Sequence, residues 1–401
     1  MKILTLGANL KGIGTYQRAF YFSRELARYG HDVTMVTVSR RSWYRPVSYY
    51  KRDWVHEYAE PCGKGPWVRM IEGPRWGDQW LPGWGSGPLD IGLRTREIWQ
   101  GCYDVVYGFE YQPNVSWPIY LTRSARPFRF FSDWCDWYSG SSNRLRGWRL
   151  AHRIDGFLEE RIRYLACKLT VTSRALYDRA RSIGIPEDRI AWIPQGSDTD
   201  YCTQLIPEET RGLLGLELDR PIVMAVNDGD MKRGIQIFRH VLRQMPEVLF
   251  VVLGQPQKPA QTLSQQLGVA PSVFFAGWVS DADYPRYLAC ADVCFLPLED
   301  NLNNRARWPG KVLDYLSAGR PVVTNDVGEV GALFCQRELG LLTGPCDEEI
   351  AEGIVNLLRD PERRRFLGQN ARRVMVEEWD WRVRGPQIAS IIEEGAGEGE
   401  R

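Results

Sequence analysis

Short, wholly apolar runs followed by segments of helical period recur along this chain, and this alternation most restricts its fold. Lys2 to Leu6 is such a run, and residues 17–29 follow it with apolar side chains at helical spacing before a stop at Gly30. Residues 31–39 (HDVTMVTVS) form the next apolar run. Strands that are apolar on both faces are typical of parallel sheets covered by helices. The pattern therefore predicts an α/β fold that begins with a βαβ unit.

The alternation begins again at residues 221–229 (PIVMAVNDG), after a polar linker. A length of 401 residues is sufficient for two domains. We expect one Rossmann-like domain over residues 1–200, a second over 201–380 and a final helix over 381–394. Residues 395–401 (GAGEGER) are of low complexity and are expected to be disordered.

Composition excludes several classes of protein. Apolar residues make up 44% of the chain and charged residues 25%, as in ordinary globular proteins, and the net charge of +1 gives no electrostatic case for binding nucleic acid. The N-terminal apolar run fits a strand better than a signal peptide, and no stretch has the apolar length of a spanning helix, so we expect a cytoplasmic protein. The four histidines lie far apart and the nine cysteines form no CxxC pair, so no zinc site is predicted.

One stretch, RWPGKVLDYLSAGRPVV (residues 307–323), carries the clearest chemical signal. It reads as a turn at Pro309, a helix from Lys311 to about Ser317 and a glycine stop. Lys311 and Asp314 are three residues apart, on one face at the helix N-terminus, where the backbone N–H groups and the dipole favour an anion. Lys311 could bind a diphosphate and Asp314 a ribose. The alternative is an amphipathic helix with a surface lysine and aspartate.

The pattern P-x-K-x-x-[DE]-Y-x-x-x-G-x-P-V-V in this stretch resembles the donor-site helix of the retaining GT-B glycosyltransferases called family 4. Residues 184–198 (GIPEDRIAWIPQGSD) are similar to the family's G-I-P-x-x-R-I-x-x-I-P-N-G-V-D. The resemblance implies two Rossmann-like domains whose parallel sheets face a central cleft, with the final helix returning to the first domain. It also implies transfer of a sugar from a nucleoside-diphosphate sugar to an acceptor hydroxyl, with retention of configuration.

A glycine-containing loop follows the first strand. Gly12 and Gly14 would let backbone N–H groups approach the donor phosphates, and the loop resembles the family's GGIGxY loop with Lys11 in place of the first glycine. As a dinucleotide fingerprint the loop is weak, because Gln17 stands where the third glycine belongs and the second strand ends in Ser39-Arg40 without an acid. An NAD enzyme is disfavoured, although Arg40 leaves an NADP oxidoreductase open.

The resemblance also assigns donor-binding residues in the second domain. The family's phosphate-binding cations correspond to Lys232 and Arg233, although Asp228 falls where an arginine is usual. Either Arg305 or Arg307 would substitute for that arginine, or the loop is shifted. The family's first paired carboxylate would count to Ala306, so Glu299 or Asp300 is the nearer candidate. The remaining expected donor contacts lie at strand ends, with Trp278 beside the nucleotide base: Asn227, Gly254 and Trp278.

The acceptor side is less defined. Asp136 with Trp137 is the closest match to a D-x-W segment that faces the cleft in some family members, and Asp133 is next. Either aspartate could orient an acceptor or cap a helix. Eleven of the 16 tryptophans precede residue 149, many of them in residues 41–100, which we read either as an acceptor-binding segment or as a loosely structured lid. A basic run at residues 144–153 could touch anionic lipid at the inner face of the membrane or simply be solvated.

These observations predict a metal-independent glycosyltransferase, with Lys311, Lys232 or Arg233 stabilising the leaving diphosphate. The expected partners are a nucleotide-sugar donor and a carbohydrate or lipid-linked acceptor, with no nucleic acid. A sugar-nucleotide epimerase or hydrolase on the same fold is one alternative. A noncatalytic nucleotide-sugar or glycan-binding protein is another, because Asp228 and Ala306 stand where the family has functional groups.

Overall fold

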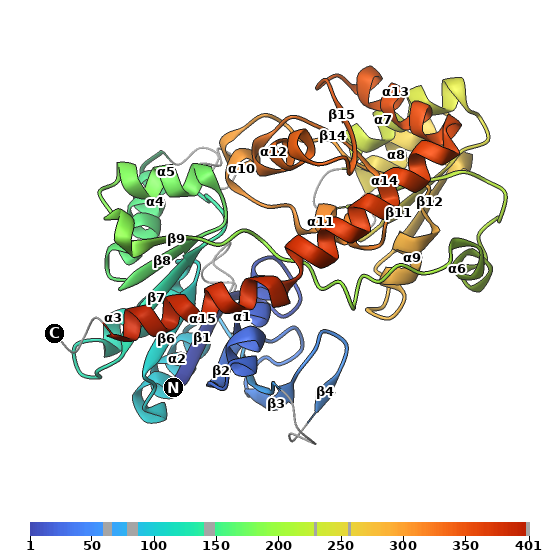
Figure 1. The fold of residues 1–401 in the computed structure, drawn as a ribbon. Helices are drawn as coiled ribbons and strands as arrows, with labels where there is room; N and C mark the ends of the chain where they lie inside the picture. Colours follow the sequence, from blue (N-terminus) through green and yellow to red (C-terminus); the bar gives the residue numbers. More distant parts are fainter. Residues whose placement is uncertain (59–65, 78–86, 140–148, 228–230, 256–257, 398–401) are drawn as a thin grey trace. The chain divides into compact units, whose positions relative to one another are not determined.

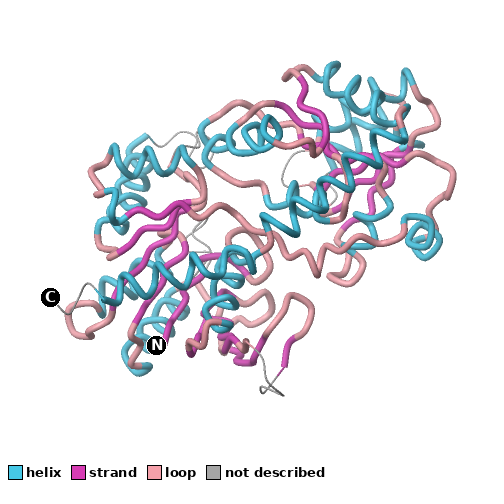
Figure 2. Tube along the Cα trace, viewed as in Figure 1, coloured by secondary structure: helices cyan, strands magenta, loops and turns pink. Residues whose placement is uncertain are grey.

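The computed structural model describes residues 1–58, 66–77, 87–139, 149–227, 231–255 and 258–397. It divides into two compact units. Unit 1 consists of Met1–Gln195, Asn301–Trp308 and Trp381–Arg401, and unit 2 of Gly196–Asp300 and Pro309–Asp380. Each unit is an α/β structure in which the strands of one sheet are flanked by helices (Figure 2).

Within the described residues, the sheet of unit 1 has nine strands in the order β4-β3-β5-β2-β1-β6-β7-β8-β9. The pairs are parallel except that β3 runs antiparallel to both β4 and β5. The central strands are buried on both faces, which is why their sequences are almost continuously apolar. The strands are β1 (Lys2–Leu10), β2 (Asp32–Val38), β3 (Val47–Lys51), β4 (Glu57–Tyr58), β5 (Val68–Gly73), β6 (Val105–Phe109), β7 (Arg129–Trp134), β8 (Lys168–Val171) and β9 (Ile190–Trp192).

The C-terminal helix packs against the first helix of unit 1. In Figure 1 the two lie side by side, and Trp381 stacks on Tyr21 with ring centroids 5.4 Å apart. The C-terminal helix continues to Gly397, so the disorder expected from residue 395 is wrong for its first three residues; residues 398–401 lie outside the described part. The helices of unit 1 are α1 (Tyr16–Arg28), α2 (Pro88–Gly101), α3 (Pro113–Thr122), α4 (Arg149–Tyr164), α5 (Arg174–Ser182), η2 (Glu187–Arg189), α10 (Leu302–Ala306) and α15 (Trp381–Gly397).

The tryptophan-rich segment is more regular than a loosely structured lid. Its described residues supply three strands of the sheet, β3, β4 and β5, and helix α2. Trp54 is buried and stacks on Tyr21, with Tyr16 and Phe20 at its edge. Trp54 therefore helps to build the core of unit 1, a tertiary role that the irregular periodicity of the segment concealed, whereas Trp43, Tyr44 and Trp99 are exposed.

The described sheet of unit 2 has six parallel strands in the order β12-β11-β10-β13-β14-β15. They are β10 (Ile222–Val226), β11 (Leu249–Leu253), β12 (Val273–Gly277), β13 (Val293–Leu296), β14 (Val322–Asn325) and β15 (Gly340–Thr343). The helices are α6 (Pro207–Leu214), α7 (Lys232–Gln244), α8 (Lys258–Gln266), η3 (Ala270–Ser272), α9 (Tyr284–Cys290), α11 (Gly310–Ser317), α12 (Gly328–Gln336), α13 (Asp347–Arg359), α14 (Pro361–Val374) and the π-helical turn η4 (Met375–Trp379). The prediction of two Rossmann-like domains is confirmed.

Each sheet has a point where the strand order reverses direction. In unit 1 this point lies between β1 and β6, and in unit 2 between β10 and β13. Loops that leave such neighbouring strands on opposite faces separate at their carboxyl ends, and open α/β sheets bind ligands there. These two edges are consequently the places to look for a site.

None of the helices in the described part of the chain has both the length and the apolar character needed to span a bilayer.

Candidate functional site

Helix α11 begins at the switch point of unit 2. The Lys311 ammonium donates a hydrogen bond to the main-chain oxygen of Val226, 2.8 Å away, and the Tyr315 hydroxyl accepts one from the Val226 N–H at 2.7 Å. Val226 is the last residue of β10. These two bonds fix the N-terminus of α11, with its lysine, at the carboxyl edge of the sheet.

Asp314 has a different set of partners from Lys311. Its Oδ2 accepts a hydrogen bond from the Tyr284 hydroxyl at 3.0 Å, and Tyr284 stacks on Tyr201. Burial raises the pKa of the Asp314 carboxyl to about 6, although hydrogen bonds from Tyr284 and Cys202 and the charge of Lys311 oppose the shift. The carboxyl is already engaged by a phenol, so a ribose would have to replace Tyr284 as the donor.

Three predicted donor-binding residues lie at neighbouring strand ends of unit 2. Asn227 follows β10, and its side chain donates to the Gln255 carbonyl at 2.8 Å. Gly254 follows β11 with a φ of 92°, and a Cβ there would lie 3.0 Å from the Asn227 oxygen. Trp278 follows Gly277 at the end of β12 and is 68% exposed. The structure thus brings Asn227, Gly254 and Trp278 to one edge.

The two basic residues at the start of α7 have different surroundings. The Arg233 guanidinium donates to the Asp347 carboxylate at 2.8 Å and to the Pro345 carbonyl at 2.6 Å, so its charge is neutralised at the N-terminus of α13. Lys232, one residue earlier, is exposed. Of the two cations, Lys232 has the greater access to solvent. Asp228 lies outside the described residues.

Glu299 and Arg307 fall in different units. Glu299 is exposed just beyond β13, in unit 2. Arg307 belongs to unit 1, where its Nε donates to the Asn304 side chain at 2.9 Å. Asn304 lies on α10, which packs against α5.

The loop after β1 requires its glycines. Gly12 and Gly14 have φ values of 75° and 58°, in the left-handed region. A Cβ at Gly14 would lie 2.6 Å from the Asn9 amide nitrogen, which donates to the Thr15 hydroxyl just before α1. Lys11, the residue that departs from the family pattern, is paired with Glu57 and Glu72. The loop lies at the switch point of unit 1.

Asp133 is in the core, which makes an acceptor-orienting role for its carboxylate wrong. Both carboxylate oxygens accept hydrogen bonds from the Arg18 guanidinium at 2.9 Å, and Thr170 donates to one of them. Arg18 also donates to the main-chain oxygen of Ile193. Asp133 and Arg18 are essentially inaccessible, so their pair ties α1 to the centre of the sheet.

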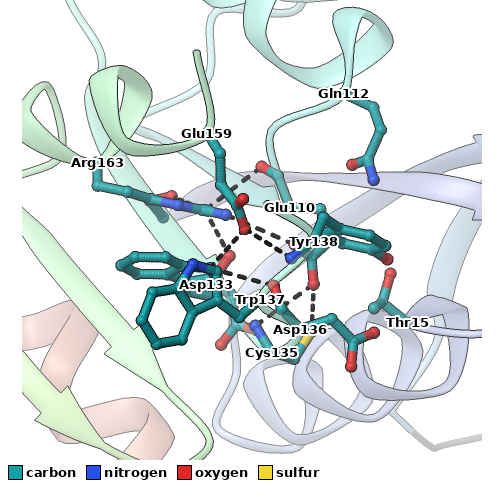
Figure 3. A network of polar contacts seen from close by, with 12 residues as sticks. Thr15, Glu110, Gln112, Asp133, Cys135, Asp136, Trp137, Tyr138, Glu159 and Arg163 are labelled. Atoms are coloured by element: carbon teal, nitrogen blue, oxygen red, sulfur yellow. Dashed lines mark hydrogen bonds and ion pairs between the residues drawn. The ribbon is translucent and has the colours of Figure 1, made fainter. Parts of the chain in front are cut away.

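Asp136 stays near the edge, on a loop that Glu159 holds in place. The Glu159 carboxylate accepts hydrogen bonds from the Trp134 indole at 2.9 Å and from the main-chain N–H groups of Tyr138 and Ser139 at 3.1 and 2.8 Å (Figure 3). Asp136 is half-buried, and its main-chain oxygen accepts a further bond from the Trp134 indole.

Glu110 is a further buried residue at this edge, and in the sequence it stands out only as the end of an apolar run. It follows β6 with a φ of 73°, and its Oε1 accepts a hydrogen bond from the Cys135 thiol at 2.8 Å. Burial raises the pKa of Glu110 to about 8, although the nearby charge of Arg163 opposes the shift. Its place at the strand-order reversal is the signal that could have identified it.

Comparisons with known proteins indicate which family and which folds this chain resembles. The family model described as "Glycosyl transferases group 1" matches residues 210–374, which contain Lys311 and Asp314. Among curated proteins, the alpha-D-kanosaminyltransferase of Streptomyces kanamyceticus is 27% identical over 244 residues, covering 58% of this chain and 61% of its own length. Residues 210–374 of this chain therefore resemble the group 1 glycosyl transferases.

A second curated relative is named for a different sugar. The GDP-mannose-dependent alpha-(1-6)-phosphatidylinositol monomannoside mannosyltransferase of Mycolicibacterium smegmatis is 28% identical over 244 residues, or 56% of this chain and 61% of the relative. The match therefore spans about three fifths of the length of the curated relatives.

Solved structures share the fold over almost the whole chain. Sucrose-phosphate synthase from Thermosynechococcus elongatus aligns with a TM-score of 0.77 over 99% of both chains at 17% identity. The glycosyltransferase WaaG, involved in lipopolysaccharide biosynthesis, aligns with a TM-score of 0.70 over 97% of this chain and 99% of its own at 17% identity. These similarities confirm the GT-B fold.

Proposed function

We propose that this chain is a group 1 glycosyl transferase that moves a sugar from a nucleoside-diphosphate sugar to an acceptor hydroxyl with retention of configuration. The observation that carries the proposal is the anchoring of Lys311 at the N-terminus of α11, at the switch point of unit 2. A fixed cation and the N-terminal end of a helix complement the negative charge of a leaving diphosphate.

Each predicted contact at this edge has a role in the proposal. Lys311 and Lys232 would bind the diphosphate, and the exposed Trp278 would lie against the base. Gly254 would let the backbone approach the nucleotide closely. The ribose hydroxyls would donate to Asp314 in place of the Tyr284 hydroxyl, since both are hydroxyl donors.

The charge for the leaving group comes from the protein in this proposal, without a metal ion. Fixed cations and a helix N-terminus perform the electrostatic task that a divalent ion performs elsewhere. Within the described residues no group of three or more potential ligands is gathered. Activity that is unchanged by a chelator would support this part of the proposal.

We place the acceptor at the carboxyl edge of the sheet of unit 1, around Asp136, and keep the N–H groups at Gly12 and Gly14 as contacts for the donor phosphates. A lipid-linked acceptor would bring the enzyme to the inner face of the membrane in the cytoplasm. The exposed Trp117 and Leu121 on α3, and Phe157 beside Arg161 on α4, are side chains suited to an interface with anionic lipid.

A thermal-shift panel of UDP, GDP, ADP and dTDP sugars tests the donor site. We expect at least one nucleotide sugar to raise the melting temperature of the wild type, because a ligand that binds only the native state stabilises it. Lys311→Ala should lose that shift, whereas Lys258→Ala, which removes an exposed lysine on α8, should keep it. Equal shifts in wild type and Lys311→Ala would refute the assignment of Lys311.

A noncatalytic nucleotide-sugar-binding protein is the second candidate. Two observations favour it: Arg233 is neutralised by Asp347, and Ala306 occupies a position where the family has a carboxylate. Such a protein would bind the nucleotide sugar without turnover. Release of nucleoside diphosphate, measured with and without an acceptor, separates this candidate from a transferase and from a hydrolase.

A further inference from the structure

The backbone of Glu110 is held in a conformation that side-chain-bearing residues rarely adopt. Its φ of 73° lies in the left-handed region, and the residue is fully buried between β6 and α3. Such strain persists only where the surrounding structure imposes it, and it is concentrated at functional sites. Glu110 also directly follows the strand at the switch point of unit 1.

Two buried oxygen atoms beside this position accept no hydrogen bond from the described residues. They are Oε2 of Glu110 and Oε1 of Gln112, whose residues are 0% and 3% exposed. The other Glu110 oxygen accepts from the Cys135 thiol, and Oε2 has only the Arg163 Nη2 atom at 3.5 Å. A buried acceptor without a donor costs free energy. Neither atom is satisfied by a hydrogen bond from the described residues, so each is open to one from a ligand.

Figure 3 shows how these groups lie at the sheet edge. Glu110, Cys135 and Arg163 form the connected network, and Gln112 and Thr15 border it without a dashed line to it. Cys135 follows β7 and Arg163 comes from α4. The Thr15 hydroxyl, which accepts from Asn9, retains its own proton to donate.

The surroundings of the Glu110 carboxyl suit it to binding a neutral ligand. Arg163 from α4 is the positive group, and Asp136 and Glu159 are the negative ones, with the Cys135 thiol in direct contact. Burial outweighs Arg163, so the pKa lies at about 8 and the carboxyl is mostly protonated at neutral pH. A protonated carboxyl both donates and accepts, as does a sugar hydroxyl.

We propose that Glu110 and Gln112 form a binding subsite for the hydroxyl groups of the acceptor, a sugar or another polyol. The proposal deepens the proposed function and rests on it for the word acceptor. One hydroxyl donates to Gln112 Oε1, and a second exchanges hydrogen bonds with the Glu110 carboxyl. A purely structural cluster would instead satisfy these two oxygens internally and would place glycine or asparagine at the left-handed position.

The first test measures polyol binding without any nucleotide. The probes are glycerol, methyl α-D-glucopyranoside and methyl α-D-mannopyranoside, observed by saturation-transfer NMR with the full chain. We expect transfer from the wild type to at least one probe and its loss in Gln112→Leu and Glu110→Gln. Two matched controls should keep the signal: Gln100→Leu and Glu97→Gln. Gln100 lies at the exposed end of α2, and Glu97 accepts a hydrogen bond from the Tyr103 hydroxyl.

The second test separates acceptor from donor. With the nucleotide sugar found by thermal shift, Gln112→Leu should raise the acceptor KM by about tenfold, the effect expected for one lost hydrogen bond in a buried site. Donor binding should change by less than about twofold, because the side chains proposed to bind the donor, Lys311, Lys232 and Trp278, belong to unit 2. If Gln112→Leu does not fold, Gln112→Asn, which retracts the oxygen by one carbon, replaces it.

The outcomes are distinct. If no probe binds the wild type, or if the variants bind as the wild type does, the subsite is refuted whatever the enzyme transfers. If the probes bind and the variants lose them, while no nucleotide sugar shifts the wild type, the subsite stands and the proposed transferase function fails.

Discussion

Arg18 and Asp133 form a buried, two-pronged ion pair, with Nε and Nη2 of the guanidinium each 2.9 Å from a carboxylate oxygen. The two residues are 115 positions apart and are at most 1% exposed. The pair joins α1 to β7 beneath the switch point of unit 1. A family pattern suggested Asp133 as an acceptor-orienting residue, but this pair gives its carboxylate a structural role.

Asp133→Ala should destabilise the protein by about 3–5 kcal/mol, because it leaves the Arg18 charge buried without its partner. Equilibrium unfolding in urea measures this loss. The control is Glu377→Gln, which breaks the exposed pair of Glu377 with Arg373 and should cost about 0–1 kcal/mol. A destabilisation by Asp133→Ala no larger than that of the control would contradict the structural role.

The stability of the protein should depend on the protonation of Asp314. Its folded pKa of about 6 lies above the ordinary value of 3.8, so the native state holds the proton more tightly than the unfolded state. The stabilisation is present in full below pH ~4 and is lost as the pH rises through about 6, by on the order of 3 kcal/mol. Chemical unfolding between these pH values should show this decline in wild type and a shallower decline in Asp314→Asn.

Nucleotide binding should show the opposite trend with pH. A ribose hydroxyl donates to the carboxylate form of Asp314, so affinity should rise as the pH passes from about 5 to about 7. Asp314→Asn should bind more weakly and lose most of that rise. Titration calorimetry measures both effects, and an identical pH profile in the two proteins would exclude Asp314 as the ribose ligand.

Glu110→Gln should remove a second pH dependence. The folded pKa of about 8 lies above the ordinary value of 4.5, so this group stabilises the native state most below pH ~4.5. That contribution is lost as the pH rises through about 8. Unfolding free energies measured from pH 6 to 9 should therefore fall less steeply in Glu110→Gln than in wild type. Glu97→Gln serves as the control and should follow the wild type.

Gly254→Ala should be more harmful than Gly184→Ala, although the two glycines share nearly the same backbone conformation, with φ of 92° and 91°. A Cβ at Gly184 meets open space, whereas one at Gly254 lies 3.0 Å from the Asn227 main-chain oxygen. In both variants the alanine must adopt a left-handed backbone conformation, which should lower the free energy of unfolding by about 1–2 kcal/mol. Only Gly254→Ala should also weaken nucleotide binding in a thermal-shift titration.

Local sequence was enough to predict the central strands of both sheets and helix α11, but not β3, β4 and β5. The apolar runs of β1, β2 and β10 report burial on both faces, and the Pro309 and Gly319 signals bound α11 to within one or two residues. The strand ends that carry Asn227, Gly254 and Trp278 could be located for the same reason, since parallel strands end at a common edge. These are properties of short segments, which periodicity and turn chemistry report directly.

Tertiary structure decided which polar groups meet. Asp314 was expected to share a face with Lys311, and the partners of the two differ. Asp314 accepts a hydrogen bond from Tyr284, 30 residues away, while Lys311 donates one to the Val226 carbonyl. Asp133 and Glu110 both stand at strand ends, yet one is paired with Arg18 and the other retains an unsatisfied oxygen. Periodicity identifies the face that a side chain occupies. The partner comes from a distant segment brought close only by packing, and it determines whether a carboxylate is structural or available to a ligand.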